Sequence, residues 1–159
     1  MEIKNILDSW SKNFGIGNLQ WDEQGVYSFK YEGIYYISIE NDIQEKGAYI
    51  YSVVGVVPPE RKEEITLNAI KANLFGKETG LSTLGYDENT QTLILSKYIP
   101  NELLNERYFT DQMEEFLAYR MLWAKKFESP ILDTPKESES ITASLRETIQ
   151  KEKVQIFFA

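Results

Sequence analysis

Carboxylates are the residues with the most obvious capacity for chemistry, because the 159-residue chain contains no histidine and no cysteine. Their absence excludes a Ser-His-Asp triad, a thiol nucleophile and the usual zinc ligands. A glycosidase-type pair needs carboxyl groups that face each other across about 5–9 Å. Neighbours in sequence diverge instead, so we expect solvated acidic faces and no catalytic residues. Adjacent carboxylates occur at Asp22-Glu23, Glu63-Glu64, Asp87-Glu88 and Glu114-Glu115.

Glycine and acidic motifs for cofactors or metals are incomplete. Gly15-Ile-Gly17 follows a predicted helix and lacks the third glycine of a dinucleotide fingerprint. Gly76-Lys77 leads into a glutamate, so it is no phosphate-binding loop. Asp87-Glu88-Asn89 lacks the periodic ligands of a calcium loop. We therefore expect neither a cofactor nor a metal ion.

The net charge of −8, from 17 basic and 25 acidic residues, limits the partners. An acidic chain repels both the phosphate backbone of nucleic acids and acidic membrane surfaces. No apolar run approaches the roughly 20 residues of a membrane span, and the N-terminus has no signal-peptide pattern. We expect a cytoplasmic protein that neither binds nucleic acid nor inserts into a membrane.

Hydrophobic periodicity predicts an α+β domain. Apolar residues from Ile3 to Phe14 recur at helical spacing, and a period of two from 26 to 57 predicts three strands in a meander. A helix over 60–75, strands over 81–86 and 92–99, and a helix over 110–127 follow. Asp111 and Glu114 resemble a capping box for the last helix. The order α-β-β-β-α-β-β-α predicts a twisted antiparallel sheet of about five strands, flanked by helices.

The composition changes after residue 127. Residues 128–159 begin with two X-Pro pairs and mixed charge, which is typical of a polar linker. Ile141, Leu145 and Ile149 could form a short amphipathic helix, and residues 154–159 are apolar and aromatic. We therefore divide the chain into a domain of residues 1–127 and a tail of 128–159 that docks on its own domain or on a partner.

The segment from Leu67 to Leu95 resembles the class I chaperones of bacterial type III secretion, the Tir-chaperone family. The order of elements extends the resemblance over residues 1–127, whereas the tail is longer than that family's pattern. The matching positions are Ala72-Asn73-Leu74-Phe75, Gly80, Leu84-Gly85-Tyr86-Asp87 and Leu93-Ile94-Leu95.

The resemblance implies an ATP-independent homodimer in the bacterial cytoplasm that serves virulence-related protein export. It implies that an extended N-terminal segment of a secreted effector binds in surface grooves and stays soluble and secretion-competent. An extended segment can also add to a sheet edge. The first helix, beside a sheet rich in tyrosine and phenylalanine, could form such a groove. Its candidate residues are Ile6, Trp10, Phe14, Tyr27, Phe29, Tyr31 and Tyr36.

The helix over 60–75 carries two neighbouring apolar stripes, where one would suffice to pack on a sheet. The second stripe indicates a subunit contact. Two alternatives stay open: a non-catalytic subunit of a heterodimeric regulatory or secretion complex on the same fold, and a small enzyme that uses carboxylates or tyrosine. The predicted dimer-interface residues are Ile65, Leu67, Ile70, Leu74 and Leu84.

Overall fold

A computed structural model of the chain describes residues 3–16, 19–42 and 46–128. The predicted α+β fold and its order of helices and strands are confirmed. The predicted tail of residues 128–159 lies outside the described residues, except for the first of them, which ends the last helix. The elements are α1 (Ile3–Asn13), β1 (Val26–Tyr31), β2 (Tyr35–Asn41), β3 (Gly47–Val56), α2 (Lys62–Asn73), β4 (Thr83–Asp87), β5 (Thr92–Pro100) and α3 (Glu106–Glu128).

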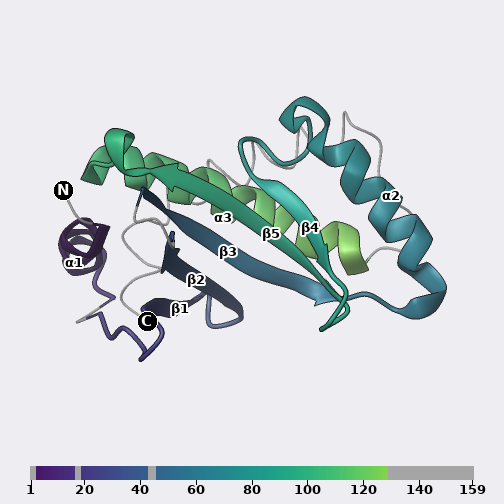
Figure 1. Cartoon of the computed structure of the whole chain (residues 1–159), viewed down its shortest axis with the longest axis horizontal. Helices are drawn as coiled ribbons and strands as arrows, with labels where there is room; N and C mark the ends of the chain where they lie inside the picture. The colour runs from purple at the N-terminus through teal and green to yellow at the C-terminus, as the bar shows by residue number, and fades with distance from the viewer. Residues whose placement is uncertain (1–2, 17–18, 43–45, 129–159) are drawn as a thin grey trace.

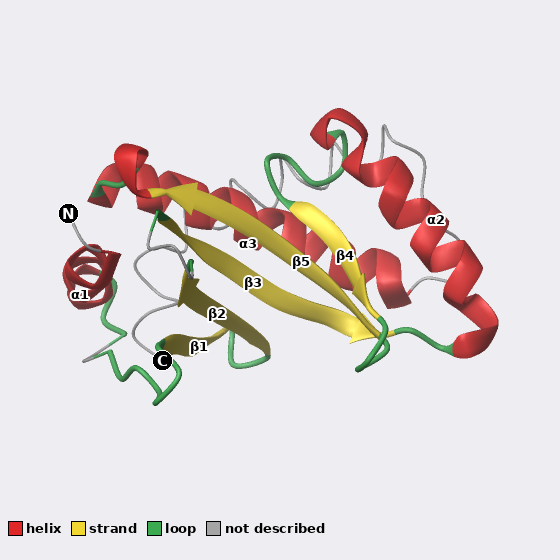
Figure 2. Cartoon of the chain, in the orientation of Figure 1, coloured by secondary structure: helices red, strands yellow, loops and turns green. Residues whose placement is uncertain are grey.

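The strands form one antiparallel sheet in the order β1-β2-β3-β5-β4. The long helix α3 runs behind the sheet, α1 lies beside one end of α3, and α2 lies at the opposite end of the molecule (Figure 1). Figure 2 shows the sheet in front of α3, so the helix covers one face of it. Alternate residues of each strand are buried on that face, as the period of two predicts.

Aromatic side chains join α1 to the sheet and to α3. The ring of Trp10 lies 5.3 Å from the ring of Phe14, 5.7 Å from that of Phe29 and 5.3 Å from that of Phe109, between centroids. Trp10 is only 2% exposed. The apolar stripe of α1 is therefore part of the core.

Helix α3 begins at Glu106, four residues before the predicted start, so the capping box at Asp111 and Glu114 is wrong. The side chain of Asn105 accepts a hydrogen bond from the backbone N–H of Tyr108 at 2.9 Å. Asparagine is a preferred residue for this capping role. Helical residues therefore continue upstream of the acidic pair, which lies inside the helix.

Two ion pairs connect α3 to other elements, one to β5 and one to the loop after α2. The Nζ of Lys97 on β5 donates to Glu115 at 2.5 Å, so this glutamate is not part of a solvated acidic face as expected. Lys126 pairs with Glu78, which lies in the loop after α2. Gly80 has φ +61° in the same loop, and a Cβ there would lie 2.5 Å from the ring of Tyr119. The loop after α2 is thus held tightly against α3.

The side chain of Asn73 connects α2 to β4, the last strand of the sheet. Its Nδ2 donates to the carbonyl of Leu84 at 2.9 Å, and its Oδ1 accepts the N–H of Leu84 at 2.8 Å. The amide thereby takes the place of a neighbouring strand. At the other margin, Trp21 forms an isolated antiparallel bridge with Tyr27 of β1.

We predict that Asn73→Ala destabilises the protein by about 1–3 kcal/mol, because two partly buried backbone groups lose their partner. Urea unfolding followed by circular dichroism measures the change. Asn68→Ala is the matched control on the same helix, since the side chain of Asn68 donates to the carbonyl of Glu64 within α2 itself. Equal stability of the two variants would contradict the bracing role of Asn73.

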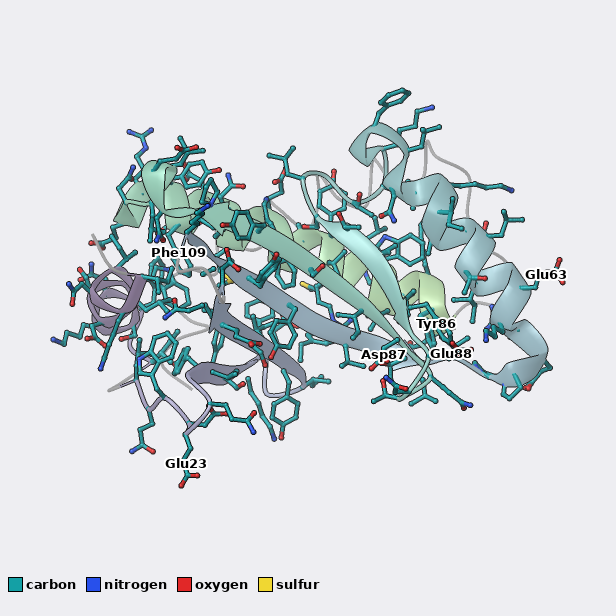
Figure 3. The ribbon with its side chains drawn as sticks, in the orientation of Figure 1. Glu23, Glu63, Tyr86, Asp87, Glu88 and Phe109 are labelled. Carbon is teal, nitrogen blue, oxygen red and sulfur yellow. The ribbon has the colours of Figure 1, made fainter. Side chains whose placement is uncertain are left out.

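The turn between β4 and β5 depends on a carboxylate. Asp87 accepts the N–H of Asn89 at 2.9 Å and the hydroxyl of Thr90 at 2.7 Å. These hydrogen bonds, that from Thr90 first, hold the pKa of Asp87 below its usual range. Figure 3 shows Asp87 and Glu88 at this turn.

We predict that Asp87→Asn lowers the urea midpoint at pH 7, and that the difference from wild type shrinks as the pH falls below about 4. A carboxylate with a lowered pKa stabilises the fold above its unfolded pKa, and this stabilisation is lost as the pH falls through the folded pKa. Glu88→Gln is the control, because Glu88 is 86% exposed and lies 3.7 Å from Lys62. A constant difference at every pH would contradict the prediction.

Candidate protein-binding surfaces

The residues predicted to form an effector groove are mostly internal. Among the predicted groove residues, Phe14 is partly buried and Tyr36 is 61% exposed. The space between α1 and the sheet is filled by the aromatic contacts of Trp10, and the buried side chains offer almost no surface to a ligand. Their contact with an effector stays a prediction. The buried members of the set are Ile6, Trp10, Tyr27, Phe29 and Tyr31.

The two stripes of α2 have different surroundings. Ile65, Ala69 and Ala72 are buried, and Leu84 of the adjacent strand is buried with them. The members of the second stripe, Leu67, Ile70 and Leu74, are exposed in the single chain. One stripe therefore packs within the chain, and the other is free to contact a partner.

The exposed stripe continues beyond the end of α2. Phe75, at φ 55°, is 90% exposed, and Leu81 in the following loop is 72% exposed. The sequence analysis did not assign these two residues to a surface. Gly76, which follows Phe75, indicates where the helix ends, but it does not indicate that the Phe75 ring is exposed to solvent. Together we call Leu67, Ile70, Leu74, Phe75 and Leu81 the α2 surface.

The face of the sheet opposite α3 carries Tyr36, Tyr49 and Tyr98, of which the sequence analysis assigned only Tyr36 to a surface. The rings of Tyr49 and Tyr98 lie 5.0 Å apart on β3 and β5. The hydroxyl of Tyr98 donates to Asp42 at 3.3 Å, and desolvation together with this carboxylate raises the pKa of Tyr98. The Nζ of Lys30 lies 4.8 Å from the ring centre of Tyr36. The period of two in β3 and β5 could have identified Tyr49 and Tyr98 as surface residues, because they alternate with buried positions.

Carboxylates do not converge on a site. Glu23 and Glu63 extend from opposite ends of the molecule, and Glu88 lies at the β4–β5 turn (Figure 3). Within residues 3–16, 19–42 and 46–128, no three acidic side chains are grouped so that they could hold a metal ion. In the same ranges, no helix is long and apolar enough to cross a membrane. The exposed features are therefore apolar and aromatic surfaces, which suit protein partners.

Relatives of known family share most of this domain. The model of the Tir chaperone protein (CesT) family matches residues 5–124. A Tir chaperone of Escherichia coli is 33% identical over 95 residues, which is 60% of this chain and 60% of that protein. A Tir chaperone of Citrobacter freundii is 28% identical over 109 residues, 69% of each chain. The chain thus matches less than two thirds of the length of the Escherichia coli relative.

Solved structures of low sequence identity share the fold. A chain of the HopA1-SchA chaperone-effector complex superposes with a TM-score of 0.64 at 17% identity, over 77% of this chain and 93% of that one. A chain of the ExsC-ExsE complex gives a TM-score of 0.64 at 18% identity, over 77% and 91%. The structure of the Yersinia pestis type III secretion chaperone SycH with a fragment of YscM2 gives 0.59 at 11% identity, over 74% and 96%.

The family model covers most of α1, all of α2, all five strands and most of α3, and the fold agrees with that of the solved chaperones. The resemblance in the Asn73, Gly80 and Asp87 segment also has a structural basis, because these residues brace α2, the following loop and the β4–β5 turn. The chain belongs to the Tir chaperone (CesT) family.

Proposed function

We propose that the protein is a non-catalytic, ATP-independent chaperone that binds an extended N-terminal segment of a type III secreted effector. It keeps this segment soluble and secretion-competent in the bacterial cytoplasm. Large apolar side chains that stay exposed on two separate surfaces, although the chain is strongly acidic, are the observation that carries the proposal. Two of the superposed structures support it further, because HopA1-SchA is a chaperone-effector complex and the chaperone SycH is in complex with a fragment of YscM2.

We propose that the α2 surface joins two copies of the chain into a homodimer. The residues of this surface are exposed and lie on α2 or in the loop that follows it. Helix α2 packs on its own chain through the other stripe, Ile65, Ala69 and Ala72. Exposed apolar patches of this kind mark protein interfaces. A two-fold contact uses the same patch on both subunits and leaves no unpaired copy of it. The sheet then stays available for the effector.

We further propose that residues 1–127 act as the chaperone domain and that residues 128–159 form a separate polar linker and tail. The change in composition after residue 127 supports this division. The family model also ends at residue 124, close to the proposed boundary.

For the dimer, we predict that the purified chain scatters light with twice its 18.5 kDa mass, and that Ile70→Glu lowers this to the mass of one chain. The glutamate places a charge in a desolvated apolar contact. Ile34→Glu is the matched control, because Ile34 is similarly exposed but lies in the turn between β1 and β2, outside the α2 surface. A monomeric wild type would favour the heterodimer alternative, and a dimeric Ile70→Glu would exclude the α2 surface.

For the chaperone activity, we predict that the dimer binds N-terminal segments of type III effectors from the same bacterium with micromolar or tighter affinity. Calorimetry measures the affinity, and light scattering gives the stoichiometry. Added ATP leaves both unchanged, since the interaction depends on apolar burial and backbone hydrogen bonds. If none of the segments binds, the proposed function fails.

A further inference from the structure

The sheet contains an opening between two of its inner strands. The ladder of β2 and β3 runs from Asn41↔Ala48 to Ser38↔Tyr51 and ends there, although both strands continue. β2 stays paired with β1 back to Tyr35, and β3 stays paired with β5 as far as Val56. In Figure 1, β3 runs well past the start of β2. By this register Tyr35–Ile37 lie opposite Ser52–Val54 without forming a ladder, and β3 continues beyond them to Val56.

Side chains bond to the backbone just beyond the last pair of this ladder, where the register would place Ile37 opposite Ser52 and Tyr36 opposite Val53. The hydroxyl of Ser52 donates to the carbonyl of Tyr36 at 2.7 Å. The Nη2 of Arg120 donates to the carbonyl of Val53 at 2.8 Å, and its Nε donates to the Ser52 hydroxyl at 2.8 Å. Hydrogen bonds from Ser52 and Arg120 thus replace those of a pairing strand.

Arg120 reaches this opening as a buried cation. The residue is 6% exposed, and its guanidinium carbon lies 4.7 Å from the ring centre of Tyr35. Its Nη1 has no hydrogen-bond partner within the part of the chain that the structure describes. Burial lowers the pKa of Arg120. Among the residues that the structure describes, no carboxylate forms an ion pair with it. A buried charge without an opposite charge is costly, and a partner's carboxylate would offset that cost.

Apolar side chains surround the opening on the outer face of the sheet. Ile34 and Tyr36 lie on the β2 side, and Val53 and Val56 lie on the β3 side, all of them exposed. Successive side chains of an extended segment point to opposite faces. A segment placed here would therefore direct alternate residues outward to this rim and the residue between them inward to Arg120.

We propose that the opening between β2 and β3 accepts an extended effector segment with an acidic residue between two apolar residues. The segment adds to the free edge of β3 beyond Tyr51. A backbone N–H of the segment takes the place of Arg120 as the donor to the Val53 carbonyl. The carboxylate of the segment then accepts hydrogen bonds from the guanidinium of Arg120, whose N–H groups can bind both carboxylate oxygens. This inference rests on the proposed function and specifies the chemistry of the segment that is bound.

The test uses two fluorescein-labelled, capped peptides, Gly-Ser-Thr-Val-Asp-Val-Thr-Ser-Gly and the same peptide with Asn in place of Asp. Fluorescence anisotropy with the full chain measures both affinities. We expect the Asp peptide to bind about tenfold more tightly, because a hydrogen bond to a charged group is stronger than one between neutral groups. In Arg120→Gln the difference disappears.

Tyr36→Ala provides a variant outside the core, in case Arg120→Gln does not fold. It should weaken both peptides severalfold, whereas Tyr49→Ala, the same substitution on the same face outside the opening, should leave both affinities unchanged. Equal affinity for the Asp and Asn peptides would overturn the inference. Peptide binding that begins only after residues 150–159 are deleted would also overturn it, since the chain's own tail would then be the occupant.

Hydrogen exchange separates this inference from the proposed function. In a complex with an effector segment, the backbone amides within residues 52–56 of β3 that face the opening should gain protection at least tenfold above that of the free chain. If effector segments bind and these amides exchange as before, the chaperone function stands and the segment binds elsewhere.

Discussion

The packing of α3 across one face of the sheet is the contact on which the rest of the structure depends. Phe109, Phe116 and Trp123 are buried along the helix, and its ion pairs reach β5 and the loop after α2. One helix can cover only one face of a five-strand sheet. Among the described residues, much of the outer face and the far side of α2 therefore remain exposed.

Periodicity in the sequence was sufficient for the order of the elements. The alternation from Tyr27 to Val57 and the two stripes of α2 identify strands and a helix with little ambiguity, because these patterns depend only on local geometry. The exposed stripe of Leu67, Ile70 and Leu74 was also predictable. A short helix that packs on one side of its own domain needs only one apolar stripe, so the second stripe indicates a further contact.

The surfaces were harder to predict, because alternation shows which side chains share a face but not which face another element covers. The α1–sheet aromatics were assigned to a groove, whereas α3 closes that side and buries Trp10 and Phe29. The opening beside Arg120 leaves no local signal either. It depends on where the β2–β3 ladder ends, and that point is set by contacts between residues far apart in the chain.

Covered sheet margins bear on how the molecule can associate with itself. The Asn73 amide occupies backbone groups of β4, and Trp21 bridges to β1, so parts of both outer edges already have partners. Pairing through strand edges can repeat without limit and lead to fibres, whereas the proposed two-fold contact through the α2 surface would close after two copies. The partners on both outer edges thus disfavour open-ended association of exposed apolar surfaces through strand pairing.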